Sequence, residues 1–292
     1  MSTVKSGYIW NKSNALNYLE WGDPGSPDLV LLHGITGTAY SWKPVAERLQ
    51  NQYHCLALNL RGRGDSGPSP ERRYDFDLFV EDVQALVDQL GLGRFLLIGH
   101  SMGGRAALAY AAAHPEYLDA LVIVDISPGM TDEGAWGLKR AMEATPAEFG
   151  SWEEALAYVK RGFPSLSEEL IKERAPYMFR REPGGSIVWK YDPLVREEWH
   201  GPDLPPRAKA HLWNELAQLQ CPMLLIKGEK TNQLTSEICE RMVENGPDSR
   251  WVEIPNTTHF VHDDNLQGFL AEVQPFLERF AGIGAPEAKT AR

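Results

Sequence analysis

The sequence predicts an α/β fold: a doubly wound, mostly parallel sheet with an inserted helical segment. Short apolar runs rich in Leu, Val and Ile end in Gly, Asp or His, and a helical pattern follows most of them. Continuous apolar runs of this kind are typical of parallel strands buried on both faces, and alternation of strand with helix is typical of a doubly wound sheet. The alternation stops between residue 128 and about residue 220, where helical and charged stretches continue without a convincing buried strand.

The elements follow in a regular order along the chain. Residues 8–10 and 15–21 alternate between apolar and polar side chains, which predicts an antiparallel hairpin at the edge of the sheet. The buried strands expected after this hairpin are residues 29–33, 53–60, 95–99, 120–126, 223–227 and 251–254. The helices expected between and after them are residues 39–50, 76–90, 101–114, 235–244 and 265–280.

The expected organisation is one core formed by residues 1–127 and 221–281, interrupted by a helical insertion at 128–220. The last residues, 282–292, are small and polar and predict a flexible tail. Tryptophans are frequent in the insertion, which either lines a pocket with them or uses them for a small core of its own. They are Trp136, Trp152, Trp189, Trp199 and Trp213.

Composition excludes several classes of partner. Of the 292 residues, 43% are hydrophobic and 24% charged, as in a globular protein with a sizeable core. The formal net charge of -11 gives no attraction to nucleic acid or anionic lipid, so neither is expected. No stretch approaches the roughly 18 apolar residues of a membrane span, and no apolar signal segment is found, so a cytoplasmic location is expected. Three widely spaced cysteines, Cys55, Cys221 and Cys239, predict free thiols.

A serine stands at a sharp corner between a predicted strand and the next helix. The sequence Gly-His-Ser-Met-Gly at residues 99–103 matches the pattern G-x-S-x-G, in which the glycines allow a strained turn and close approach of strand and helix. The five-residue pattern alone is weak, but its position between a strand and a helix is the context that supports it. The motif therefore predicts that Ser101 presents its hydroxyl at the carboxyl end of the sheet as a nucleophile.

Over residues 8–280 the chain resembles the α/β-hydrolase fold family. The resemblance depends on His33-Gly34 after the third strand, on the serine corner, and on His259 after the last strand. The insertion corresponds in position to the helical cap of that family. The resemblance implies an oxyanion hole formed by the backbone amides of Ile35 and Met102.

A serine hydroxyl is a poor nucleophile without a general base, and the base needs an orienting acid. The family order is serine, then acid, then histidine. His259 comes directly after the last predicted strand, where the family has its catalytic histidine, and is the expected base. His262 is the alternative, and capping of a surface helix is the non-catalytic interpretation of both histidines.

The acid of the expected triad has more than one candidate. In the family it commonly follows the strand before last, but here the corresponding positions hold Thr231 and Asn232. Asp125 ends the preceding strand, at a position that some family members use, and is the favoured acid. Glu229 and a Ser-His dyad without an acid are the alternatives, and a turn-forming or capping role is the non-catalytic interpretation of Asp125.

Two further motifs are weighed and set aside. His259 and His262 are followed by two aspartates, but no His or Cys cluster completes a coordination sphere, so no metal is expected. Residues 62–67 match G-x-G-x-x-G, but Pro68 and Pro70 follow where a dinucleotide-binding motif needs a helix. A structural loop or a pocket rim is predicted there.

The expected reaction is acyl transfer to water through an acyl-enzyme, without a cofactor. The expected substrate is a small to medium apolar or aromatic ester, thioester, lactone or amide, because the insertion is rich in tryptophan. Hydrolysis of a carbon-carbon bond and cofactor-independent lyase or oxygenase chemistry use the same frame and stay open. The alternative from another class is a ligand-sensing protein with little turnover. Sequence alone leaves the oligomeric state open.

Overall fold

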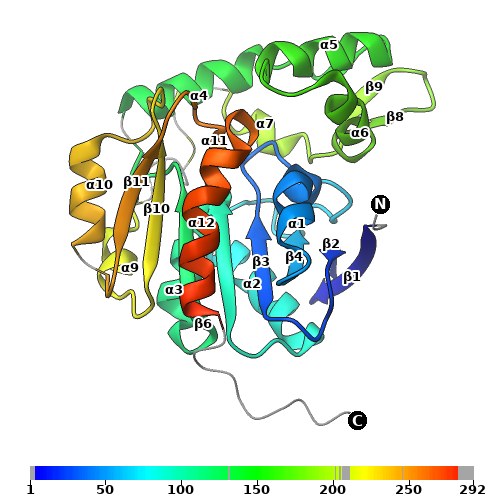
Figure 1. The fold of residues 1–292 in the computed structure, drawn as a ribbon. Coiled ribbons are helices and arrows are strands. Elements are labelled where there is room, and N and C mark those ends of the chain that lie inside the picture. Colours follow the sequence, from blue (N-terminus) through cyan, green and yellow to red (C-terminus); the bar gives the residue numbers. More distant parts are fainter. Residues whose placement is uncertain are drawn as a thin grey trace.

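The computed structural model describes residues 4–281 except 131, 201, 204, 206–210 and 245. Its centre is an eight-stranded sheet with the order β1-β2-β4-β3-β5-β6-β10-β11 (Figure 1). The strands are β1 (Lys5–Asn11), β2 (Asn14–Trp21), β3 (Asp28–Leu32), β4 (His54–Leu58), β5 (Phe95–His100), β6 (Leu118–Val124), β10 (Met223–Gly228) and β11 (Arg250–Ile254).

Strand directions agree with the sequence prediction. β1 and β2 form an antiparallel hairpin with β1 at the edge, and β2 also runs antiparallel to β4. From β4 to β11 every neighbouring pair is parallel. The edge hairpin and the mostly parallel sheet are therefore confirmed. The strand order brings the carboxyl ends of β3, β5, β6, β10 and β11 side by side at one edge of the sheet.

Helices cover both faces of the sheet. The core helices are α1 (Lys43–Leu49), α2 (Phe76–Leu90), α3 (Met102–Ala113), α10 (Ser236–Val243) and α12 (Leu266–Phe280). Apolar side chains of α1 and α12 pack on one face, and those of α2, α3 and α10 pack on the other. In α2 the buried residues Phe79, Val83 and Leu86 recur at a spacing of three or four, which gives the helix one apolar side.

The helix predicted over residues 39–50 is divided into two. A 3-10 helix, η1 (Ala39–Trp42), precedes α1, and Pro44 lies in the first turn of α1. Proline lacks the amide hydrogen needed inside a helix but is tolerated in the first turn, so it marks the start of a new helix.

The described residues between 128 and 212, called the cap below, lie above the carboxyl ends of the strands (Figure 1). The cap helices are α4 (Asp132–Ala144), α5 (Trp152–Gly162), α6 (Glu168–Met178) and α7 (Leu194–Glu197). The next helix, α9 (Trp213–Ala217), packs against α3 of the core instead of joining the cap. The tail predicted at 282–292 lies outside the described residues.

The expectation that the insertion has no buried strand is wrong. Three short strands, β7 (Glu148–Phe149), β8 (Phe179–Arg181) and β9 (Ile187–Trp189), form an antiparallel sheet in the order β7-β9-β8. Phe149, Phe179 and Trp189 are buried between them and the cap helices. Strands of two or three residues are shorter than the four to eight residues over which alternation becomes visible, so the sequence pattern misses them.

The three cysteines are free thiols, as predicted. Burial raises the pKa of each thiol to about 12, so the thiolate is not populated at neutral pH; the residues are Cys55, Cys221 and Cys239. Among the described residues no helix combines the length and the apolar character that crossing a bilayer requires.

Candidate active site

Ser101 occupies a strained corner between β5 and α3. Its backbone has φ 54° and ψ −123°, a conformation that a residue with a side chain rarely adopts. The flanking residues must be glycines because a larger side chain would clash with the backbone. A Cβ on Gly99 would lie 2.3 Å from the carbonyl oxygen of Gly103, and a Cβ on Gly103 would lie 2.4 Å from the carbonyl oxygen of Leu32. The corner therefore holds the serine side chain out of the helix at the edge of the sheet.

His259 lies next to the serine. Its Nε2 is 2.9 Å from Oγ of Ser101 and its Nδ1 is 2.7 Å from Oδ2 of Asp125. With the imidazole proton on Nδ1, the ring donates to the carboxylate and accepts from the serine hydroxyl. The peptide of His259 is fixed as well, because Nε2 of His100 donates to its carbonyl oxygen at 2.8 Å. These hydrogen bonds join one side chain from each of three loops at the carboxyl edge.

Asp125 follows β6 and is fully buried. Its φ of 53° is a second strained backbone position in the site. Besides His259, its carboxylate accepts the backbone amide of Gly228 on Oδ1 at 2.8 Å and the hydroxyl of Thr231 on Oδ2 at 2.6 Å. Three donors thus take the place of water around this buried carboxylate and hold its orientation.

Thr231 is a functional candidate that sequence reasoning missed. It occupies a position where the family commonly has an aspartate, and the structure puts a hydroxyl there that bonds the carboxylate supplied by Asp125. The backbone amide of Gln233 donates to this hydroxyl at 3.1 Å, so the hydroxyl proton is left for Asp125. The sequence did hold a signal for this role, because Thr231 carries a hydroxyl in the loop that follows the second-to-last strand of the core.

The alternative residues lie elsewhere. Glu229 is exposed, and its carboxylate accepts the backbone amide of Asn256 at 2.6 Å. His262 stacks on Trp42 with 4.4 Å between the ring centroids, and burial lowers its pKa to about 4. The structure therefore brings Asp125 and His259 to the serine.

The His33-Gly34 loop lies directly beside Ser101. A Cβ on Gly34 would lie 3.2 Å from Nδ1 of His100 and 3.3 Å from Cβ of the serine, so glycine allows the loop to approach closely. His33 Nδ1 donates to the carbonyl oxygen of Gly34 at 2.7 Å, and Nε2 accepts the amide of Leu60 at 3.2 Å. Burial lowers the pKa of His33 to about 3, so the ring is neutral and bonds the loop through both nitrogens.

The two amides expected to form the oxyanion hole belong to residues that line the same pocket as Ser101. Met102 is the first residue of α3, where the amide has no acceptor within the helix. The carbonyl oxygen of Ile35 accepts Nε of the buried Arg63 at 3.2 Å, which holds the neighbouring peptide in place. Arg63 comes from the G-x-G-x-x-G segment, so that segment supports the loop beside Ser101, a contact that sequence reasoning did not foresee.

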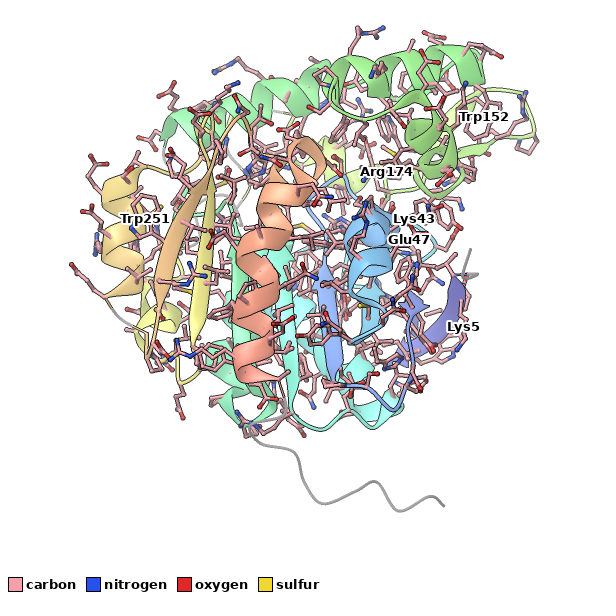
Figure 2. The ribbon with its side chains drawn as sticks, viewed as in Figure 1. Lys5, Lys43, Glu47, Trp152, Arg174 and Trp251 are labelled. Carbon is pink, nitrogen blue, oxygen red and sulfur yellow. The ribbon has the colours of Figure 1, made fainter. Side chains whose placement is uncertain are left out.

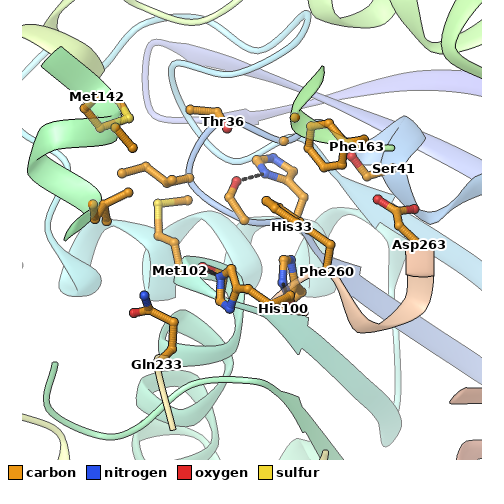
Figure 3. Close-up of a pocket in the computed structure, with 18 of the residues that line it drawn as sticks. His33, Thr36, Ser41, His100, Met102, Met142, Phe163, Gln233, Phe260 and Asp263 are labelled. Carbon is orange, nitrogen blue, oxygen red and sulfur yellow. Dashed lines mark hydrogen bonds between the residues drawn. The ribbon is translucent and has the colours of Figure 1, made fainter. Parts of the chain in front are cut away.

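A cavity of about 500 Å³ extends from Ser101 under the cap (Figure 3). Met142 and Ser41 lie on opposite sides of the close-up, and Asp263 lies on the side of Ser41. Apolar side chains dominate the wall formed by α4 and the neighbouring loops, among them Ile126, Met130, Leu138 and Met142. The side chains around Ser41 are more polar and include Arg174, His262 and Asp263.

The two predicted roles do not account for all five tryptophans. Trp189 and Trp199 are buried and line the cavity. Trp136 is 40% exposed, Trp152 packs edge-on against Phe179, and the ring of Trp213 lies 4.0 Å from the guanidinium of Arg241. Among the described residues, no group of three His, Cys, Asp or Glu side chains is arranged to hold a metal ion.

Comparison with known proteins identifies the family of the fold. Residues 27–266 match the family model of the alpha/beta hydrolase fold. N-formylmaleamate deformylase of Pseudomonas putida is 30% identical over 288 residues, covering 95% of this chain and 98% of that protein. A 2-(acetamidomethylene)succinate hydrolase of Mesorhizobium japonicum is 24% identical over 265 residues, covering 90% and 91%.

The solved structures support the same assignment at the level of the fold. A crystal structure of E-2-(acetamidomethylene)succinate hydrolase superimposes with a TM-score of 0.85 at 22% identity, covering 94% of this chain and all of that one. The match of the family model extends from the amino terminus of β3 to the first residue of α12 and so includes every loop that contributes to the site. The chain therefore belongs to the α/β hydrolase fold family.

Proposed function

We propose that this protein is a serine hydrolase that cleaves a small to medium, chiefly apolar carboxylic ester or a related acyl compound through an acyl-enzyme on Ser101. One observation carries the proposal: Ser101 lines a largely apolar cavity and is the first member of a hydrogen-bonded chain that continues through His259 to the buried Asp125. A nucleophile bonded to a base, and a base bonded to an orienting acid, is the arrangement that activates a serine hydroxyl.

In the proposed acylation step, Oγ of Ser101 attacks the substrate carbonyl while Nε2 of His259 takes the hydroxyl proton. Asp125 stabilises the imidazolium that forms and keeps the Nδ1 proton on the histidine. The amides of Ile35 and Met102 donate to the developing oxyanion. The imidazolium then protonates the leaving alkoxide or amine, the carbonyl re-forms, and the acyl group stays on Ser101.

Deacylation reverses the roles with water as the nucleophile. Nε2 of His259 takes a proton from the water, the hydroxide adds to the acyl carbonyl, and the same proton returns to Oγ as the ester bond to Ser101 breaks. The products are a carboxylic acid and the regenerated enzyme. Each step uses protein groups and water alone, so the scheme requires no cofactor.

The substrate class follows from the cavity. We call the wall formed by α4 and the neighbouring loops, with Met130, Leu138 and Met142, the methionine-rich side of the cavity. Its apolar side chains, together with the tryptophans of the lining, favour an apolar acyl or alcohol group over a charged one. An amide bond fits the same chemistry, and the names of the relatives above, a deformylase and an acetamidomethylene compound's hydrolase, support including amides in the substrate screen.

In the sequence, Thr231 and Asn232 stand where an acid is common, and this absence slightly favours carbon-carbon hydrolysis or lyase or oxygenase chemistry, in which the histidine acts chiefly as a base on the substrate. The contact of Asp125 with His259 removes that reason. A ligand sensor with the same fold has no need for a serine that is both strained and bonded to an imidazole.

The test uses p-nitrophenyl esters from acetate to octanoate, matching anilides, and a fluorophosphonate probe. The wild type is expected to release nitrophenol and to become labelled at Ser101, and Ser101→Ala to lose both, with turnover lower by on the order of 10⁴-fold or more. Labelling of Ser101→Ala at another residue, or turnover unchanged by the substitution, would refute the proposal. Ligand binding by a wild type that neither turns over nor labels would instead indicate a sensor.

A further inference from the structure

The segment that carries His259 is held between the core and the cap. β11 ends at Ile254 and the single-turn helix α11 (Val261–Asp264) starts two residues after His259, so the histidine lies in a loop without a strand ladder of its own. We call residues 258–264 the histidine segment. Its position depends on the contacts that surround it, and several of these contacts come from the cap.

The strongest cap contact is a buried ion pair. Arg174 of α6 donates Nη1 to Oδ2 of Asp263 at 2.9 Å and Nη2 to Oδ1 at 2.5 Å, and the two side chains are 5% and 4% exposed. Burial by itself would raise the pKa of Asp263, but the guanidinium outweighs it and holds that pKa below its usual value. Figure 2 shows Arg174 where the cap meets the core, close to Lys43 of α1. A bidentate pair with this burial fixes both position and orientation.

Two more cap residues hold the same segment on either side of the histidine. Oγ of Ser165 donates to Oδ1 of Asp264 at 2.6 Å. The other oxygen of Asp264 accepts the backbone amide and the hydroxyl of Thr258 at 2.7 and 2.6 Å, so this contact reaches the residue before His259. The ring of Phe163 packs on that of Phe260, the residue after it, with 4.5 Å between centroids.

Arg174 also reaches a core segment on the same side of the cavity. Its Nη2 donates to the carbonyl oxygen of Ser41 at 3.2 Å, in η1 after the His33-Gly34 loop. One cap side chain therefore ties the histidine segment to the part of the core that follows the expected oxyanion loop. The nucleophile is positioned differently, because its corner is determined by β5, α3 and the packing of two glycines.

We infer that Arg174 is a positioning residue for His259, acting through Asp263. This inference rests on the proposed function, since it assigns a role in holding the general base. The cap then does more than enclose the substrate. Without the ion pair between Arg174 and Asp263, the histidine segment shifts and Nε2 of His259 is displaced from Oγ of Ser101. Displacement of a catalytic group by about 1 Å can cost on the order of 10²-fold in rate. The loss applies even to a substrate too small to touch the cap.

The experiment compares Arg174→Gln with Glu173→Gln. Glu173 is the neighbouring residue on the same helix and forms its own ion pair from cap to core, but with Lys43 of α1 at 2.8 Å. Turnover of p-nitrophenyl acetate and the rate of Ser101 labelling by diisopropyl fluorophosphate are measured, with circular dichroism as the check of folding. In Arg174→Gln, kcat and the labelling rate are expected to fall by roughly 10- to 100-fold while KM changes less than about twofold. Glu173→Gln is expected to match the wild type.

Conservative and double variants separate positioning from general stability. Arg174→Lys is expected to recover part of the loss, because it keeps the charge opposite Asp263 but not the bidentate geometry. Asp263→Asn combined with Arg174→Gln is expected to be no slower than the slower single variant, since both remove one interaction. If Arg174→Gln does not fold, Ser165→Ala and Arg174→Lys decide: reduced kcat and labelling in both support the inference, and wild-type values in both refute it.

The inference and the proposed function fail in different ways. A wild type that neither turns over nor labels contradicts the proposed function itself. A wild type that labels at Ser101, together with a folded Arg174→Gln that labels equally fast or differs in KM alone, contradicts only the positioning role.

Discussion

The hydroxyl of Thr231 lies 2.6 Å from Oδ2 of Asp125, the same oxygen that accepts Nδ1 of His259 at 2.7 Å. One carboxylate oxygen therefore receives a proton donor from each side, from the loop after β10 and from the loop after β11. The position that commonly supplies the acid in this family here supplies a donor to an acid that comes from β6. The loop after β6 thus supplies the carboxylate, and the loop after β10 supplies a hydroxyl that bonds it.

Replacement of the two candidate acids tests which carboxylate serves His259. Asp125→Asn keeps the shape of the side chain but offers the imidazole an amide, and is expected to lower kcat by about 10⁴-fold. Glu229→Gln is the matched control, because its carboxylate bonds the Asn256 amide, and is expected to stay within about twofold of the wild type. The measurement is kcat on p-nitrophenyl acetate, and equal effects of the two substitutions would contradict this assignment.

Two substitutions of Thr231 separate the effect of its hydroxyl from the effect of its methyl group. Thr231→Val removes the hydroxyl and leaves Oδ2 of the buried Asp125 with one donor fewer, at a cost of about 1.5–3 kcal/mol for a hydrogen bond to a charged group. Because the same oxygen orients His259, kcat/KM is expected to decrease about 10- to 100-fold. Thr231→Ser keeps the hydroxyl and is expected to retain most activity. A Thr231→Val variant as fast as the wild type would show that the hydroxyl does not matter, and a Thr231→Ser variant as slow as Thr231→Val would show that the hydroxyl is not sufficient without the methyl group.

The buried histidines predict acid sensitivity of the fold. Burial lowers the pKa of His262 to about 4, so in the native state the ring stays neutral where the unfolded chain, with a pKa near 6.5, binds a proton. Stability therefore falls as the pH drops below about 6.5, by up to about 1.4 kcal/mol per pH unit for this histidine, until the pH reaches about 4. His33 and His100, whose pKa values are also lowered by burial, act in the same direction.

The measurement for this prediction is urea unfolding at pH 7 and pH 5. His262→Phe keeps a ring to stack on Trp42 but has no proton to take up, so its free energy of unfolding is expected to fall less between the two pH values than that of the wild type. An identical decrease in both proteins would assign the acid sensitivity to other groups.

The methionine-rich side of the cavity predicts selectivity for chain length. Met142 is buried and lines the cavity on the wall formed by α4. Met142→Phe places a stiffer, wider side chain there and is expected to lower kcat/KM for p-nitrophenyl octanoate at least about tenfold relative to p-nitrophenyl acetate. The ratio of the two values is the measurement. A ratio that does not change would mean that the acyl chain binds elsewhere.

The sequence predicted the core elements because their signals are local. β3 and β4 are continuous apolar runs, α2 has a clear helical spacing and ends at a glycine, and the serine corner is a five-residue motif. The strands that the sequence did not predict are those that lack a local signal. β7, β8 and β9 are too short to show a period, and their residues are buried by packing against one another across as many as 40 residues of chain.

The sequence by itself determined the order of strands and helices in the core, the strained serine corner and the histidine after the last strand, since each depends on residues that are neighbours in the chain. Only the tertiary structure decided which carboxylate meets His259 and which groups hold it. The bonds of Asp125 to Gly228, Thr231 and His259 span 103, 106 and 134 residues, and that of Arg174 to Asp263 spans 89. Such contacts leave no periodic signal in the sequence, because they form only when parallel strands align their carboxyl ends and the cap closes over them.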